Sequence, residues 1–230
     1  MTFKNRLFQW LDRLHYRHIL MQLCKDGLQI HTVYDIGAHK GRWTKEHARI
    51  FPQAKFWMFE ANEEHAEKLK TRGHPFFIGV LSSRSELLRF YKKAGTGDSL
   101  YRENTDHYNE ASFIEVHARP LSDVVREKGL PNPDFIKLDV QGAELDILEG
   151  ASALLPTCAL LLLECPLVPY NIGAPDLQTY LNKLKQLGFS PLRITEQHSD
   201  AGLLLQMDIL FLQDKARERL YRSSALLKSV

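Results

Sequence analysis

The sequence lacks the features that would place it outside the cytoplasm or across a membrane. It has 3 cysteines, an odd number, and no Cys-x-x-Cys spacing, so neither a disulfide framework nor a zinc site is expected. No apolar run reaches the roughly 18 residues that a membrane helix needs. Lys4, Arg6 and Asp12 interrupt the first apolar residues, where a secretory signal has an unbroken core. We therefore expect a cytoplasmic protein.

An excess of charge of either sign is also missing. The chain has 30 basic and 28 acidic side chains and a net charge of +2. A chain with nearly equal numbers of basic and acidic side chains creates no strong electrostatic potential, so we expect no nucleic-acid partner. Its 230 residues suit one α/β domain with a large core and are too few for two such domains.

Apolar runs typical of strands alternate with helical patterns along most of the chain. The expected strands are Thr32 to Ile36, Lys55 to Phe59, Phe76 to Val80, Leu87 to Tyr91, Phe113 to Ala118, Phe135 to Leu138, Ala159 to Leu163, Ser190 to Ile194 and Met207 to Leu212. The expected helices are Arg42 to Phe51, Glu63 to Arg72, Leu121 to Lys128, Ala143 to Leu148 and Asp176 to Leu187. Alternation at this spacing indicates βαβ units and a parallel sheet.

Two helical segments flank the predicted domain, which spans residues 29–213. Residues 1–28 form an amphipathic pattern that fits packing on the domain, packing on a second subunit in a homodimer, or peripheral contact with a membrane surface. Residues 214–230 are basic and predict a C-terminal helix or tail. The polar stretch from Lys92 to Ala111 predicts a loop or lid over the site.

A glycine-containing turn follows the first strand, in the order Asp35-Ile36-Gly37-Ala38-His39-Lys40-Gly41. Glycine lets the backbone approach a ligand closely where a side chain would collide. A dinucleotide fingerprint starting at Gly37 needs glycine where His39 and Arg42 stand, and a Walker A loop is absent as well. This turn is therefore not expected to bind a pyrophosphate or a triphosphate.

Two carboxylates accompany the turn. Asp35 lies just ahead of it, where an ammonium or sulfonium can be held. Glu60, followed by Ala61, ends the next strand, where a carboxylate can accept hydrogen bonds from both ribose hydroxyls. This order of acids and glycines favours S-adenosylmethionine as the cofactor. The alternative is that both are ordinary strand-end or helix-capping carboxylates.

A second motif carries a resemblance to a known family. The run Ile136-Lys137-Leu138-Asp139-Val140-Gln141-Gly142-Ala143-Glu144, followed by Leu148-Glu149-Gly150-Ala151, resembles the hallmark of the FkbM-type methyltransferases. The resemblance extends from about Thr32 to Leu212. It implies a Rossmann-like class I methyltransferase fold, with a mainly parallel seven-stranded sheet, an antiparallel last strand and helices on both faces. It also implies S-adenosylmethionine as cofactor and methylation of a hydroxyl on a saccharide or natural product.

The resemblance implies a set of cofactor-binding residues. These are Asp35, Gly37, Ala38 and Gly41 around the methionine and nucleoside, Glu60 and Ala61 at the ribose, and Leu81 and Ser82 beside the adenine. The run Gly97-Asp98-Ser99-Leu100 also resembles a family element, to which we assign no role from the sequence.

The candidates for chemistry at the acceptor are Asp139, Glu164, Glu144 and His39, with Asp139 first. Asp139 and Glu164 end adjacent strands and should project over the same edge of the sheet. Such a pair suits a general base with an orienting partner, or a divalent cation that acidifies the hydroxyl. A structural role stays open, with Glu144 opposing the dipole of its helix. For His39 the alternative is an exposed loop histidine.

Further side chains suggest how an acceptor is bound. Lys137 fits pairing with an acid inside the sheet as well as a role at the site, and Tyr170 and Asn171 are available to recognise hydroxyls. The expected partner is a small-molecule or glycan acceptor. Two other functions remain open, namely a nicotinamide-dependent oxidoreductase and a non-catalytic module that binds S-adenosylmethionine.

Overall fold

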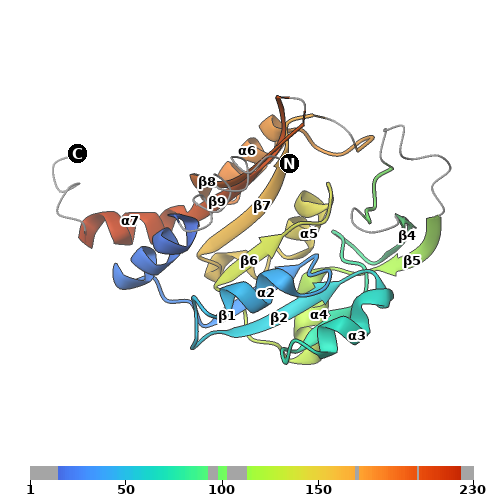
Figure 1. The fold of residues 1–230 in the computed structure, drawn as a ribbon, viewed down its shortest axis with the longest axis horizontal. Helices are drawn as coiled ribbons and strands as arrows, with labels where there is room; N and C mark the ends of the chain where they lie inside the picture. The colour runs from blue at the N-terminus through green and yellow to red at the C-terminus, as the bar shows by residue number, and fades with distance from the viewer. Residues whose placement is uncertain (1–14, 93–97, 103–112, 169–170, 201, 224–230) are drawn as a thin grey trace.

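The computed structural model describes residues 15–92, 98–102, 113–168, 171–200 and 202–223 (Figure 1). A seven-stranded sheet in the order β3-β2-β1-β6-β7-β9-β8 runs through this part of the chain. Its strands are β1 (Thr32–Ile36), β2 (Lys55–Glu60), β3 (Phe76–Ile78), β6 (Phe135–Leu138), β7 (Leu160–Pro166), β8 (Phe189–Asp200) and β9 (Leu203–Gln213). The antiparallel pair β4 (Glu86–Tyr91) and β5 (Phe113–Ala118) lies outside this sheet.

The pairing of the strands confirms the predicted topology. β1 is central and pairs in parallel with β2 and β6, and β6 pairs in parallel with β7. The last strand, β9, is antiparallel to both of its neighbours, β7 and β8. The carboxyl ends of β1, β2, β6 and β7 therefore meet at one edge of the sheet, where open α/β sheets place their ligands.

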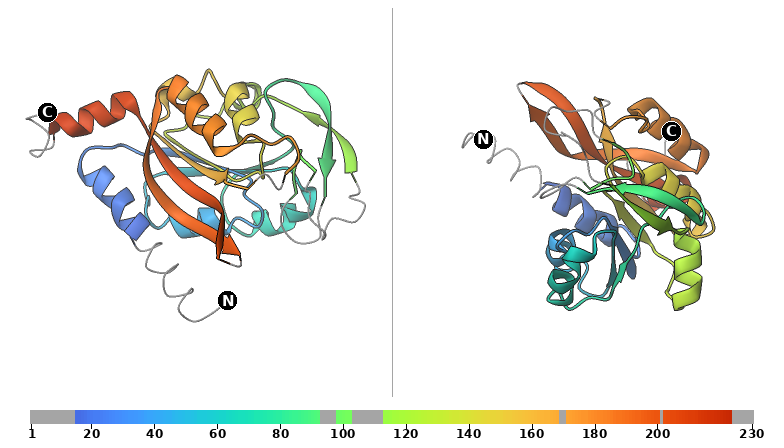
Figure 2. Two further views of the ribbon diagram at one scale, coloured as in Figure 1. Left: turned by 90° about the horizontal axis from the view of Figure 1, so that it is seen from above. Right: turned by 90° about the vertical axis from the view of Figure 1, so that its right-hand side faces the viewer.

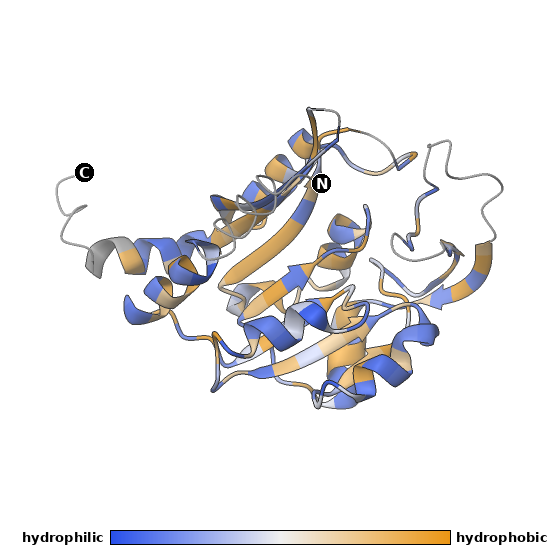
Figure 3. Ribbon diagram, in the orientation of Figure 1, coloured by the Kyte–Doolittle hydropathy of each residue, from blue (hydrophilic) through white to orange (hydrophobic). Residues whose placement is uncertain are grey.

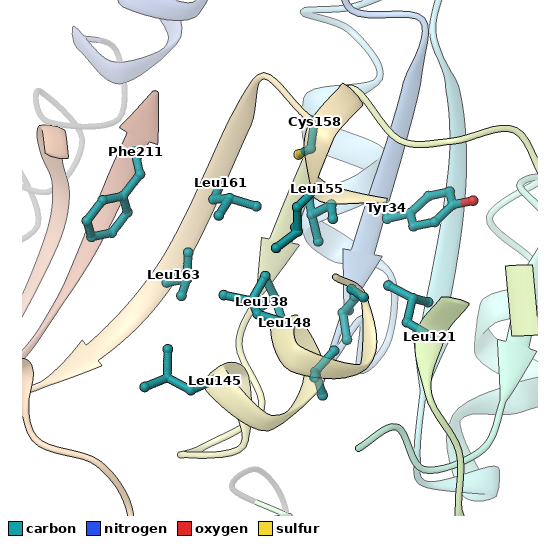
Figure 4. Packing of buried hydrophobic residues seen from close by; sticks show 14 of the residues in the cluster. Tyr34, Leu121, Leu138, Leu145, Leu148, Leu155, Cys158, Leu161, Leu163 and Phe211 are labelled. Carbon is teal, nitrogen blue, oxygen red and sulfur yellow. The ribbon is translucent and has the colours of Figure 1, made fainter. Parts of the chain in front are cut away.

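One face of the sheet is covered by α4 (Leu121–Lys128), α5 (Glu144–Gly150) and α6 (Leu177–Gln186). Figure 4 shows leucines of β6 and β7 beside Leu145 and Leu148 of α5. Leu138, Leu148 and Leu163 are at most 1% exposed. Burying such side chains stabilises the fold by about 1.5–3 kcal/mol each, which anchors the loop between β6 and α5.

The opposite face is covered by the helix of residues 15–25, α2 (Arg42–His47), α3 (Ala66–Lys70) and α7 (Asp214–Ser223). Tyr16 and Leu20 are buried in the same cluster as Leu210 and Ala216, so the first and last described helices both pack on this face (Figure 2). The prediction of helices on both faces is confirmed. Among the described helices, none is long and apolar enough to cross a membrane.

Hydropathy follows this layered arrangement. In Figure 3, β6 and β7 are hydrophobic along most of their length and carry hydrophilic residues near their carboxyl ends. The burial of all four residues of β6 explains why this run is apolar except for Lys137. Polar side chains thus gather at the edge where the four parallel strands end.

Several elements differ from their predicted bounds. The predicted helix from Glu63 to Arg72 is a 3-10 turn, η1 (Glu63–His65), followed by the shorter α3. The hairpin β8–β9 extends to Asp200 and Leu203, well beyond the predicted strand ends, because the backbone of each strand finds its hydrogen bonds on the other. Of the predicted lid, residues 93–97 and 103–112 lie outside the described part, as do residues 1–14 and 224–230 of the predicted terminal helices.

Candidate active site

Two cavities meet at the carboxyl edge of the sheet. The first, of about 200 Å³, is lined by residues including Phe59, Glu60, Ala61, Leu81, Asp98, Val140 and Gln141. The second, of about 530 Å³, is lined by residues including Tyr16, Arg17, Trp43, Lys137, Glu196 and Asp208. Gly37, His39 and Asp139 line both cavities. A group bound in one cavity therefore lies next to a group bound in the other.

The turn after β1 is pressed against the turn after β6. Gly37 has a φ of +73°, and a Cβ added to it would lie 1.9 Å from the carbonyl oxygen of Asp139. The backbone N–H groups of Gly37 and Ala38 both donate to the carbonyl of Phe59 at 3.0 Å. Only glycine fits this position, and the close approach keeps both cavities next to Asp139.

Gly41 fits tightly at the start of α2. It has a φ of +65°, and a Cβ there would lie 2.9 Å from the Met58 sulfur and 2.8 Å from Arg72 Cγ. Gly41 is absent from the walls of both cavities, and Ala38 lines the second cavity rather than the first. These two positions shape the turn, and their contact with a cofactor stays a prediction.

Glu60 lies in the wall of the first cavity, as a ribose-binding residue should. Its Oε2 accepts from the backbone N–H of His39 at 2.6 Å, and its Oε1 accepts from that of Asn62 at 2.8 Å. Burial raises the pKa of Glu60, although both backbone bonds favour the carboxylate. Each oxygen keeps a second lone pair, so the carboxylate can still accept two hydroxyl bonds from a ligand. Ala61 lines the same cavity.

The two residues predicted beside the adenine separate in space. Leu81 lines the first cavity, as does Phe90 of β4. Ser82 is buried but absent from the walls of both cavities, and its backbone N–H donates to the carbonyl of Arg119 at 3.0 Å. Adenine contact by Ser82 therefore has less geometric support than contact by Leu81, and both stay predictions.

Asp35 is fully buried and absent from both cavity walls, where the sequence predicts direct contact with the methionine portion. Its Oδ2 accepts from the Thr44 hydroxyl at 2.6 Å, and its Oδ1 lies 3.3 Å from Lys137 Nζ. The negative charge of Asp35 is thus compensated by Lys137 and Thr44 of the protein itself. In this geometry Asp35 positions α2 and Lys137 rather than touching a ligand.

Lys137 joins Asp35 to Asp139 across β1 and β6. Its Nζ lies 3.3 Å from Asp139 Oδ2 and donates to the carbonyl of Gly37 at 3.1 Å. Burial by itself lowers the pKa of Lys137, but Asp139 and Asp35 outweigh burial and raise it, so the ammonium stays charged. The predicted pairing with a neighbouring acid is present, and Lys137 also lines the second cavity.

Asp139 and Glu164 belong to one hydrogen-bonded network, linked by a residue that the sequence analysis assigned no role. The Gln141 side-chain amide donates to Glu164 Oε1 at 2.8 Å and to Asp139 Oδ1 at 3.4 Å. Burial, with the charges of Asp139 and Asp208, raises the pKa of Glu164 well above its usual value. Asp139 is 43% exposed and reaches both cavities. Of the predicted pair, Asp139 is thus the carboxylate placed to meet a ligand.

Glu144 has no exposed surface and lines neither cavity, so its predicted contact with an acceptor has no geometric support and stays a prediction. Its carboxylate accepts from the backbone N–H groups of Val140 and Gly142 at 2.9 and 3.0 Å, and from the Tyr180 hydroxyl. Burial raises the pKa of Glu144 despite these bonds. The contacts correspond to the structural alternative, since they hold the loop that carries Asp139.

Two of the remaining candidates, His39 and Asp98, line the first cavity, whereas Asn171 lines neither cavity. The backbone N–H of His39 contacts Glu60, and its ring meets His65 edge-on at 4.3 Å between centroids. Asp98 Oδ2 accepts from the Asn62 amide at 2.8 Å, which ties the family-like run to the turn after β2. Asn171 donates to the carbonyl of Gln141 at 2.9 Å. Gly97 and Tyr170 lie outside the described residues.

Comparison with known proteins agrees with this geometry. The model of the methyltransferase FkbM domain matches residues 35–191, more than half of the chain. The chain belongs to the FkbM methyltransferase family. A curated relative, "2-O-methyltransferase NoeI" of Sinorhizobium fredii, is 28% identical over 136 residues, which cover 51% of this chain and 56% of that protein. The match to the relative thus covers less than two thirds of its length.

A solved structure confirms the fold class of this FkbM-family chain. Magnesium protoporphyrin IX methyltransferase (ChlM) from Synechocystis PCC 6803, solved with bound SAH, superposes with a TM-score of 0.50 at 12% identity. The match covers 87% of this chain and 82% of that one. The Rossmann-like class I methyltransferase fold implied by the sequence is confirmed.

Several residues at the site of this FkbM-family chain were not predicted from the sequence. Gln141 links two carboxylates, and Trp43, Glu196 and Asp208 line the second cavity. One signal was available for Lys137, because aligning the carboxyl ends of β1 and β6 places it directly opposite Asp35. Asp208 and Glu196 carried no such signal, since their approach depends on an antiparallel hairpin with three register shifts.

Proposed function

We propose that this chain is an S-adenosylmethionine-dependent O-methyltransferase acting on a hydroxyl of a saccharide or natural product. The observation that carries the proposal is the junction of the two cavities at Gly37, His39 and Asp139. A methyl donor in the first cavity and an acceptor in the second meet at this junction. Such alignment of reactants supplies much of the rate of a displacement reaction. Membership of the FkbM family supports the same reaction class.

The residues of the first cavity fit S-adenosylmethionine. Gly37 lets the turn after β1 lie against the Asp139 carbonyl beside this cavity, and Glu60 offers free lone pairs for the two ribose hydroxyls. Phe59 and Leu81 give the same cavity apolar walls suited to an adenine ring. When bound there, S-adenosylmethionine supplies an electrophilic methyl group.

The second cavity suits a polyhydroxylated acceptor. Trp43 is stacked on His47, with 3.9 Å between ring centroids, and lines this cavity together with Asp139 and Asp208. An aromatic face with nearby carboxylates can contact the apolar side of a sugar and accept bonds from its hydroxyls. The name of the relative NoeI, a 2-O-methyltransferase, supports an oxygen acceptor.

Asp139 is the proposed general base. It accepts the proton that the acceptor hydroxyl loses as the hydroxyl oxygen gains the methyl group. Lys137 contacts one of its oxygens and Gln141 the other, so the carboxylate is oriented before the acceptor binds. Gln141 also spans from Asp139 to Glu164, which favours a metal-free arrangement of this pair over the predicted divalent cation. Among the other candidates, His39 stays a predicted contact at the junction.

The partners and location expected from the sequence stay predictions. All three cysteines are free thiols, which agrees with a reducing compartment such as the cytoplasm. The amphipathic pattern of the first helix is the support for a peripheral membrane contact and for a homodimer.

Titration calorimetry with S-adenosylmethionine and S-adenosylhomocysteine tests the cofactor assignment. We expect micromolar binding to the wild type and at least about tenfold weaker binding to Glu60→Gln, which corresponds to about 1.4 kcal/mol. Glu63→Gln is the matched control, because Glu63 is an exposed carboxylate just beyond β2 that lines neither cavity. Transfer of a labelled methyl group to hydroxyl compounds then separates an enzyme from a binding module.

Two results would contradict the proposal. One is the absence of binding by the folded wild-type protein, and the other is an equal loss of affinity in both variants. Binding of NAD instead of S-adenosylmethionine would favour the nicotinamide-dependent alternative.

A further inference from the structure

Three carboxylates lie side by side across three adjacent strands near the second cavity. Glu164 of β7 is directly opposite Asp208 of β9, and Asp208 is directly opposite Glu196 of β8. Residues paired in this way project from the same face of a sheet, and like charges at such positions repel each other. A nearby positive charge reduces this repulsion, as Lys137 does for Glu164 and Asp208.

The outer end of this row includes a histidine. Glu196, His198 and Asp208 each offer one ligand atom, and these atoms all lie within 4.8 Å of one another. His198 Nε2 is 4.0 Å from Asp208 Oδ1, which is too long for a hydrogen bond. Two ligands at about 2.0–2.2 Å from one ion are separated by about 3–4 Å. The observed spacing is close to that of ligands around a single ion.

An independent observation comes from Asp208 itself. Its Oδ1 is buried, and no hydrogen-bond donor in the described part of the chain reaches it. A buried carboxylate oxygen without a partner is costly, and such atoms are rare in folded proteins. Either a cation or a proton would relieve this oxygen.

We propose that Glu196, His198 and Asp208 bind one divalent cation of the first transition series. Two carboxylate oxygens and one imidazole nitrogen suit Mn²⁺ or Zn²⁺, whereas Mg²⁺ prefers oxygen ligands throughout. This site differs from the pair Asp139 and Glu164, since the Gln206 amide donates to Glu164 Oε2 at 2.6 Å and Gln141 to Oε1.

The position of the site gives the ion a function. Glu196 and Asp208 line the second cavity, so the coordination positions that the protein leaves open face the acceptor. An ion there binds one or two acceptor hydroxyls and fixes which of them points at Asp139. This function rests on the proposed methyl transfer, whereas binding of the ion does not.

The test is metal binding by the full chain after removal of metals with a chelator. We titrate Mn²⁺ alone, followed by electron paramagnetic resonance of the free ion, with Mg²⁺ in a parallel series. We expect one Mn²⁺ per chain, and at least tenfold weaker binding by Asp208→Asn and by His198→Gln. Asp200→Asn is the matched control, because it removes an exposed carboxylate from the same strand, β8, outside the cluster, and should leave binding unchanged.

His198 is 41% exposed, so His198→Gln should fold even if Asp208→Asn does not, and circular dichroism checks both. Absence of Mn²⁺ binding by the wild type at millimolar concentration would overturn the proposal. So would binding that survives both substitutions, or that Asp200→Asn weakens equally. Calorimetry with S-adenosylmethionine on the same samples separates the two proposals, because a protein that binds Mn²⁺ at these residues and no cofactor disproves only the methyltransferase function.

Discussion

Gly37 decides how closely the turn after β1 approaches the turn after β6. Its positive φ and the short distance from its added Cβ to the Asp139 carbonyl act together, so an alanine would strain the backbone and push the loops apart. Two other positive φ values, at His39 and Gln141, belong to non-glycine residues at the same junction. Such strain persists only where the surrounding structure holds it, and it is common at active sites.

We therefore predict that Gly37→Ala lowers the free energy of unfolding by about 3 kcal/mol or more and abolishes cofactor binding. Gly73→Ala is the control, because Gly73 has the same φ of +73° but no atom within 4 Å of its added Cβ. The control should cost only the backbone strain, about 1–2 kcal/mol. Urea unfolding of both variants makes the comparison, and equal losses would show that the close approach is unimportant.

At the scale of elements, a buried ion pair joins β1 to β6. Asp35 and Lys137 lie directly opposite each other in the parallel ladder, and both side chains are almost fully buried. Removing one partner leaves the other as an uncompensated buried charge, which is far more costly than losing an exposed pair. The pair therefore links the stability of the central strands to the orientation of Asp139.

Accordingly, Lys137→Met should lower the free energy of unfolding by about 3–5 kcal/mol. Adding Asp35→Asn removes the stranded charge and should recover most of this loss. Lys183→Met breaks an exposed pair with Glu149 and should cost less than about 0.5 kcal/mol. Unfolding of Lys137→Met at the same urea concentration as the wild type would contradict this role of the ion pair.

The elements also show how far local sequence patterns reach. The predicted bounds of β1, β5, β6 and α4 are confirmed, because each is a short run bounded by a clear turn or breaker. The hairpin β8–β9 is much longer than predicted. Its far end contains His198, Ser199 and Asp200, which have no strand-like pattern and extend only because β9 lies alongside.

For the whole molecule, stability should depend on pH through the buried acids of this row. Asp208 has a pKa of about 8 in the folded protein, against 3.8 for an aspartate exposed to solvent as in the unfolded chain, so the native state holds a proton that the unfolded chain has lost. Stability from this group is therefore lost as pH rises toward 8. Burial lowers the pKa of His47 from 6.5 to about 4. Stability from His47 therefore rises with pH up to about 6.5, which opposes the effect of Asp208, and is constant above that pH.

We predict that, with a chelator present, the free energy of unfolding falls between pH 6.5 and 8 by at most about 1.4 kcal/mol per pH unit for each proton lost. Asp208→Asn should flatten this decline, with Glu164 contributing the remainder in the same direction. Chemical unfolding at a series of pH values measures the slope. A wild type whose stability rises over this range, or an unchanged slope in the variant, would contradict the assignment.

The sequence by itself determined the fold class, the family and the two loops at the ends of β1 and β6. These features depend on local patterns and on glycines, and short motifs are enough to specify both. It also identified Asp139 and Glu60 by their places at strand ends. Only the tertiary structure decided which carboxylates line the two cavities. Asp35 is near a strand end and Glu144 is at a helix start, positions that suggest a catalytic or binding role. Both are buried instead against distant partners, Asp35 against Lys137 and Glu144 against Tyr180. Glu196 and Asp208 come together through the pairing of β8 with β9, which no local pattern encodes.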